Sequence, residues 1–254
     1  MLFHFKYGSG DHAMLSELFG DLSHKNNNPH VENAFKEMEQ AISLLQKEMN
    51  RYEDPTHDLR KLEIWTRGLV SSLTELDESY VAAEFFRKSI VIAGFMDDMS
   101  VKEQLDYARY VYFYKNGFIR VFALLDKLGT FLNEVYDLET SKVKSQYSYF
   151  TVLRQFSDKH THQSLGRKLE AIREEYRQPI NDIRKRRNAE IHYMNAEMED
   201  DLWQRHQGLH DKIILEDVDK HLLELKLGVD MVSRTLSTVY AYTSERWIRK
   251  DIQT

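Results

Sequence analysis

The chain has 254 residues, a net charge of −6 and no cysteine. The absence of cysteine excludes a disulfide-stapled domain and thiolate chemistry. The acidic charge argues against a constitutive, sequence-blind nucleic-acid binder, so any contact with RNA must use a local basic patch. Three prolines and ten glycines leave few positions for turns and favour long helices.

Membrane insertion and secretion are both disfavoured by the pattern of apolar residues. No apolar run reaches the roughly 18–20 residues that a membrane helix needs. The first residues also lack the basic region and apolar stretch of a secretion signal. We therefore expect a soluble, cytoplasmic protein with no membrane partner.

In chain order, the first helical pattern follows Pro29 and runs to about Met49. The second follows Asp54-Pro55, a pair typical of an N-cap with proline at the first helical position. It runs to about Met96. The cluster at residues 97–100, Asp-Asp-Met-Ser, is the best candidate for a boundary within the chain.

The second half carries the more regular patterns. Apolar residues recur at alternating three- and four-residue steps from Val111 to Val135, which predicts a central amphipathic helix. Two helical stretches follow, at about 142–178 and 179–205, with a break around Asp158 to His162. The last pattern, Val218 to Val239, has the seven-residue repeat of helices that pack nearly parallel or antiparallel.

These patterns predict an all-α fold without strands. We expect an up-and-down helical bundle of four main helices over residues 99–254, with residues 1–98 as an N-terminal helical extension packed on it.

The helical segment from Pro179 to Met194 is the part of the chain that can carry chemistry. Its apolar stripe consists of Ile180, Ile183, Ile191 and Met194, with Arg187 in the middle, all within about 80° of arc. A guanidinium in an apolar stripe needs a partner, because an unpaired buried charge is costly.

Three polar side chains lie along one edge of this stripe: Arg184, Asn188 and His192. Asn188 and His192 are four residues apart and are therefore neighbours on the helix surface. Arginine suits phosphate because its donors form a planar fork. Histidine suits proton transfer because its unperturbed pKa is near neutrality.

The sequence Arg187-Asn188-Ala-Glu-Ile-His192 resembles the motif of HEPN domains: an arginine, a polar residue, three or more further residues and a histidine. The stretch from Tyr114 to Gly129 is similar to the first long helix of that family. An arginine followed by a histidine four to six residues later also occurs at Arg51/His57, Arg154/His160 and Arg205/His210. Only Arg187 lies at the centre of an apolar helical stripe ahead of a long final helix.

The resemblance covers about residues 99–254 and implies a helical bundle that is often dimeric. Many members are metal-independent ribonucleases of toxin–antitoxin, anti-phage or RNA-processing systems. It implies Arg187 and His192 as catalytic residues, and Asn188, Arg184, Lys185 and Arg186 as substrate-binding residues. It further implies a bacterial homodimer that acts on RNA without metal or cofactor, with a cognate antitoxin or other protein as a further partner.

Other interpretations of the same residues stay open. Arg187 can form a structural salt bridge to a carboxylate such as Asp126, and the basic run from Arg184 to Arg187 can be a solvated face. The whole domain can be a non-catalytic HEPN-like module for ligand binding, dimerisation or scaffolding. Two histidine pairs have metal-ligand spacing but no evident third ligand; they are His160/His162 and His206/His210.

Overall fold

The computed structural model describes residues 28–51, 54–90, 98–192 and 216–253, with side chains as far as residue 248. These ranges form helices and no strand, which confirms the predicted all-α class. The helices are α2 (Pro29–Arg51), α3 (Asp58–Arg87), α4 (Val101–Val135), α5 (Thr140–Val143), α6 (Tyr149–Asp158), α7 (Gln163–Glu175), α8 (Arg177–His192) and α10 (Val218–Gln253). None of the helices in these ranges is long and apolar enough to cross a membrane.

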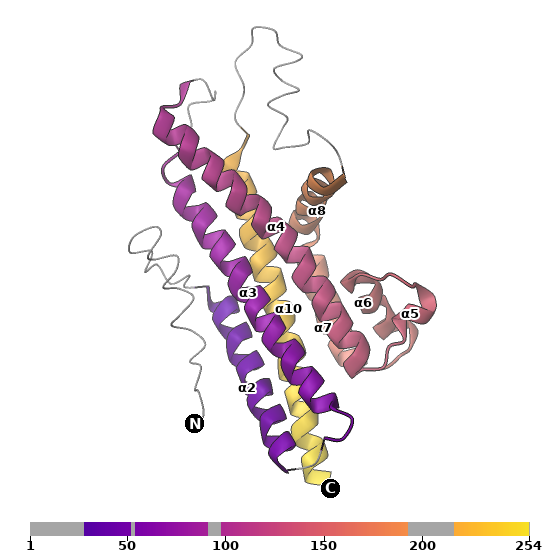
Figure 1. Cartoon of the computed structure of the whole chain (residues 1–254). Coiled ribbons are helices and arrows are strands. Elements are labelled where there is room, and N and C mark those ends of the chain that lie inside the picture. Colours follow the sequence, from indigo (N-terminus) through magenta and orange to yellow (C-terminus); the bar gives the residue numbers. More distant parts are fainter. Residues whose placement is uncertain (1–27, 52–53, 91–97, 193–215, 254) are drawn as a thin grey trace, which may run out of the picture.

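Four long helices form the main bundle: α2, α3, α4 and α10. Figure 1 shows them running side by side, and α10 contacts each of the other three. Polar contacts also link the first helices to the rest, and two of them are buried. The Asn28 side chain donates to Asp230 of α10 over 2.6 Å, and the Tyr240 hydroxyl of α10 donates to Thr66 of α3 over 3.1 Å.

The shorter helices pack against one side of this bundle. Helix α6 contacts α4, α7 contacts α10 and α6, and α8 contacts both α4 and α10. In Figure 1 they lie beside α4, away from α2. The break predicted around residues 158–162 is confirmed between α6 and α7, where His160 and His162 have positive φ values of 52° and 49°.

One hydrophobic core runs through the whole assembly. Its members include Leu73 of α3, Leu125 of α4 and Val232 of α10, each fully buried. The core therefore continues across residue 98. The division of the chain into a 1–98 extension and a 99–254 domain stays a prediction.

The helix ends show where local sequence sets structure. Ser100 and Glu103 form a capping box at the start of α4, with the Ser100 amide donating to Glu103 over 2.8 Å. The predicted N-cap at Asp54 is wrong, because His57 is the N-cap of α3; the Asp54 carboxylate still accepts from the amides of Leu59 and Arg60 in the first turn. Helix α3 thus begins at Asp58, later than predicted, because Pro55 and Thr56 form a turn first.

Gly129 and Gly68 give a matched test of packing. A Cβ atom on Gly129 would lie 3.0 Å from the Tyr149 Cα atom, so Gly129→Ala should push α6 from α4 and lower the free energy of unfolding by about 1–2 kcal/mol. Gly68 has open space around it, so Gly68→Ala should raise that free energy by about 0.5–1 kcal/mol. Urea unfolding measures both, and equal effects of the same sign would contradict this packing.

Candidate functional site

Helix α8 carries all the predicted catalytic and substrate-binding residues. Contacts with α10 hold it in place. At its start, Arg234 of α10 donates to the Tyr176 hydroxyl over 2.9 Å and pairs with Glu175. Further along, Ile180 and Ile183 are buried. A Cβ atom on Gly228 of α10 would lie 3.1 Å from the Ile183 side chain, so a larger residue there would require Ile183 to shift by a few tenths of an ångström.

Two arginines of α8 lie over aromatic rings. The Arg187 guanidinium carbon is 4.8 Å from the centre of the Phe122 ring of α4, and that of Arg184 is 4.9 Å from the Phe150 ring of α6. Stacking of this kind restricts a guanidinium to one plane while its N–H edges stay available for anions. The two arginines are also close to each other. Desolvation lowers the pKa of Arg184, and the positive charges of Arg187 and Arg173 lower it further.

Arg187 is half-buried and forms no ion pair among the described residues. Its Nε atom is fully buried without a hydrogen-bond partner there. The carboxylate of Asp126 does not serve as its partner but accepts from the Tyr149 amide over 3.0 Å, at the first residue of α6. Partial desolvation raises the pKa of Asp126, and the Tyr149 amide and the charge of Arg187 oppose that rise. Within the described residues, the Arg187 guanidinium therefore has an aromatic neighbour but no paired carboxylate.

Arg186 points elsewhere, into a buried polar cluster between α4, α8 and α10. It pairs with Glu224 of α10 and donates to the Tyr114 hydroxyl of α4 over 3.0 Å. Burial acts to lower the pKa of Arg186, but Tyr114 and Glu224 raise it overall. The Tyr114 ring also stacks on His221, with ring centres 5.5 Å apart. These contacts favour a structural role for Arg186, and its predicted contact with substrate stays untested.

The remaining predicted residues face outward. The Lys185 side chain is 79% exposed and lies 3.4 Å from Asp182. Asn188 is half-buried and His192, at the end of α8, is exposed. Next to it, Ile191 is 51% exposed, so the predicted apolar stripe is buried only over its first half. Its last member, Met194, lies outside the described residues.

Arg187 and His192 diverge within one chain. Five residues turn a helix by about 140° beyond one full turn, and α8 stays helical through His192. The fold thus brings together Arg184, Arg187 and the two aromatic rings. It does not by itself bring His192 onto the same side as Arg187.

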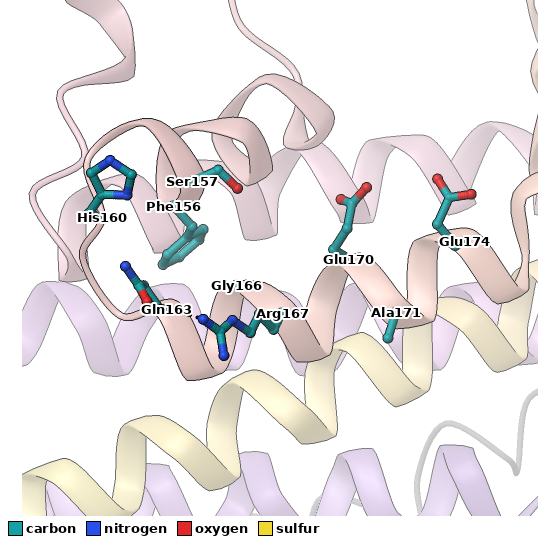
Figure 2. Close-up of a pocket in the computed structure, with 9 residues that line it drawn as sticks. All are labelled: Phe156, Ser157, His160, Gln163, Gly166, Arg167, Glu170, Ala171 and Glu174. Carbon is teal, nitrogen blue, oxygen red and sulfur yellow. Dashed lines mark hydrogen bonds between the residues drawn. The ribbon is translucent and has the colours of Figure 1, made fainter.

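Other parts of the described structure give weaker evidence for a functional site. An open pocket of about 450 Å³ lies between α6 and α7, lined by Phe156, His160, Gln163, Arg167 and Glu170 among others, and contains none of the predicted catalytic or substrate-binding residues. Figure 2 shows Glu170 and Glu174 on the same side of α7. In the described part of the chain no cluster of three metal-ligating side chains occurs. His162 instead contacts Tyr242 and Arg246, and the pair His206/His210 lies outside that part.

Three contributors to the site were not predicted as such: Phe122, Phe150 and Glu224. Glu224 gave the clearest signal, because it is an acidic residue directly before Leu225 in the apolar stripe of the last helix. A carboxylate at the edge of a buried stripe calls for a cationic partner.

The all-α helical bundle is that of a protein of the HEPN class. The family model for HEPN_Cthe2314-like HEPN matches residues 65–244, and the chain belongs to this family. The match begins within α3 and ends within α10. Comparisons with curated proteins and with solved structures found no match.

The Arg186–Glu224 pair can be tested by stability. Glu224→Gln leaves a partly buried guanidinium without its counter-charge, so the free energy of unfolding should fall by about 2 kcal/mol. The control Asp182→Asn removes the partner of an exposed lysine and should cost less than about 0.5 kcal/mol. Chemical denaturation measures both, and a Glu224→Gln protein as stable as the control would remove the assigned role of this pair.

Proposed function

We propose that this protein is a metal-independent ribonuclease of the HEPN type, acting as a homodimer. One observation carries the proposal. Arg184 and Arg187 are held over aromatic rings, without a carboxylate paired to them in the described structure, on the same helix as the exposed His192. Two such guanidiniums form a site for the phosphates of a nucleic acid.

The proposed reaction is an internal transesterification of RNA. The ribose 2′-oxygen attacks the adjacent phosphorus while the bond from phosphorus to the 5′-oxygen breaks. A base takes the proton of the 2′-hydroxyl and an acid gives a proton to the leaving 5′-oxygen. The products are a 2′,3′-cyclic phosphate and a 5′-hydroxyl, so atoms and electrons balance without a metal or cofactor.

Each residue then has a role that follows from its surroundings. His192 is exposed to solvent and serves as the general acid or base. Arg187 stabilises the charge that develops on the phosphorane oxygens. Arg184 and Asn188 bind neighbouring phosphate, Lys185 adds long-range attraction, and Arg186 fixes the rotation of α8 through Glu224.

The setting of this activity is part of the proposal. RNA cleavage of this kind serves toxin, defence or RNA-processing systems in the bacterial cytoplasm. A cognate antitoxin or other protein partner would act by covering the exposed end of α8 at Ile191 and His192.

A second candidate is a non-catalytic HEPN module for ligand binding, dimerisation or scaffolding. The divergence of Arg187 and His192 on α8 favours it, because one chain alone does not present both side chains to one phosphate. The same arginines would then bind an anionic ligand without chemistry.

Purified protein in excess EDTA should cleave RNA. Arg187→Ala and His192→Ala should each lower kcat/KM by about 100-fold or more, because each removes charge stabilisation or proton transfer. The control Lys185→Ala, on an exposed side chain of the same helix, should lower it by less than about 10-fold and less still at high salt.

Two results would contradict this assignment. Cleavage that survives both Arg187→Ala and His192→Ala would place the activity at another site or in a contaminant. No cleavage of several RNA classes by folded wild-type protein would favour the non-catalytic module.

A further inference from the structure

A carboxylate of α4 lies beside the arginines of the candidate site. Asp126 follows Phe122 by one helical turn, so the two residues are neighbours on one face of α4. The Arg187 guanidinium lies over the Phe122 ring, and its charge acts on the Asp126 carboxylate. Helices α6 and α8 both pack against α4 (Figure 1). Asp126 therefore lies where these three helices meet.

The Asp126 carboxylate has one oxygen engaged and one available. Its Oδ1 atom accepts from the Tyr149 amide over 3.0 Å. In the part of the chain that the structure describes, its Oδ2 atom forms no hydrogen bond or ion pair. Asp126 is exposed, so a ligand can reach it from solvent. The Tyr149 amide fixes the direction of the carboxylate while Oδ2 stays open to a proton donor.

The groups that surround Asp126 favour its use as a base. From α8 it faces the charge of Arg187, and from α6 it receives the Tyr149 amide. On its own helix, Lys127 turns away and donates to Ser72 of α3 over 2.7 Å. Partial desolvation outweighs the effects of Tyr149 and Arg187, and raises the pKa of Asp126 above its ordinary value. A carboxylate with a raised pKa is a stronger proton acceptor.

The proposed reaction needs both a base and an acid, and His192 supplies one of them. We propose that Asp126 is the base: it takes the proton of the ribose 2′-hydroxyl while His192 gives a proton to the leaving 5′-oxygen. The bond from the 2′-oxygen to phosphorus forms as the bond from phosphorus to the 5′-oxygen breaks. Both side chains are exposed, so exchange with water restores their protonation. The inference rests on the proposed function and supplies its second proton-transfer group.

The position of Asp126 relative to Arg187 supports this division of roles. Helix α8 directs Arg187 and His192 apart, whereas Asp126 lies beside Arg187 within the same chain. A phosphate bound by Arg187 therefore lies close to the Asp126 carboxylate. The two guanidiniums of Arg184 and Arg187 outweigh the single carboxylate in charge. The site thus keeps a net positive charge and still attracts phosphate.

Asp126→Asn tests the role of the carboxylate while it keeps the fold. The amide oxygen of asparagine can still accept from the Tyr149 amide, so thermal unfolding should match the wild type. In RNA cleavage with EDTA, kcat should fall by about 100-fold or more because the proton acceptor is lost. KM should stay unchanged or fall, because a negative charge beside the arginines is removed. The control Glu134→Gln removes another carboxylate of α4, the partner of Lys61, and should leave kcat unchanged.

The pH dependence of cleavage separates a base from a residue that only supports the fold. For the wild type, kcat/KM should rise with pH through the raised pKa of Asp126, because the ionised carboxylate accepts the proton. It should fall again at higher pH as His192 loses its proton. Asp126→Asn should lose the rising limb and keep the falling one. Asp126→Glu, which retains a carboxylate, should recover the rising limb and part of the rate.

The outcomes that contradict the role of Asp126 differ from those that contradict the ribonuclease. Cleavage by Asp126→Asn at the wild-type rate, or with the rising limb kept, would overturn the assignment of Asp126 and leave the proposed function intact. A lower rate that comes with earlier thermal unfolding, and that Asp126→Glu does not restore, would make Asp126 structural. A folded wild-type protein that cleaves no RNA would overturn both the proposed function and the base assigned to it.

Discussion

The ion pair between Arg186 and Glu224 is the constraint on which the candidate site depends. Four consecutive basic residues on a helix point in four directions, about 100° apart. Once Arg186 is fixed toward α10, the helix also sets the directions of the other three side chains. Arg187 and Arg184 turn onto Phe122 and Phe150, and Lys185 turns to solvent. Gly228 of α10 lies close to Ile183 of α8 and leaves room for that side chain.

This constraint separates two uses of the same residue type. Arg186 holds the helix because a carboxylate faces it, whereas the carboxylate of Asp126, the partner that the sequence suggested for Arg187, accepts from the first amide of α6 instead. An aromatic ring orients a guanidinium without neutralising it. The basic run is therefore neither a solvated face nor wholly a salt-bridge network. One ion-paired arginine, Arg186, and two arginines over aromatic rings, Arg184 and Arg187, therefore lie along a single helical turn.

Much of the fold was predictable because helical periodicity is a local property. The stripes of α4 and α10 and the break at residues 158–162 follow from spacing alone, as does the central place of Arg187 on α8. The start of α3 was harder to predict. The Asp54 carboxylate accepts from an amide of α3 across a turn, and residue spacing does not reveal that turn. The partners Phe122, Phe150 and Glu224 come from distant parts of the chain. A sequence shows which residues need a partner, but the packing of the helices determines which partner each residue contacts.

The central claim is that Arg187 and His192 act on one phosphate although α8 directs them apart in a single chain. A complementation experiment tests it most directly: Arg187→Ala and His192→Ala proteins are unfolded together, refolded to exchange subunits, and assayed for RNA cleavage in EDTA. If each site combines Arg187 of one copy with His192 of the other, the mixed dimer retains one intact site, and a substantial fraction of wild-type activity should return. A mixture that exchanges subunits and stays as inactive as either variant alone would contradict the account.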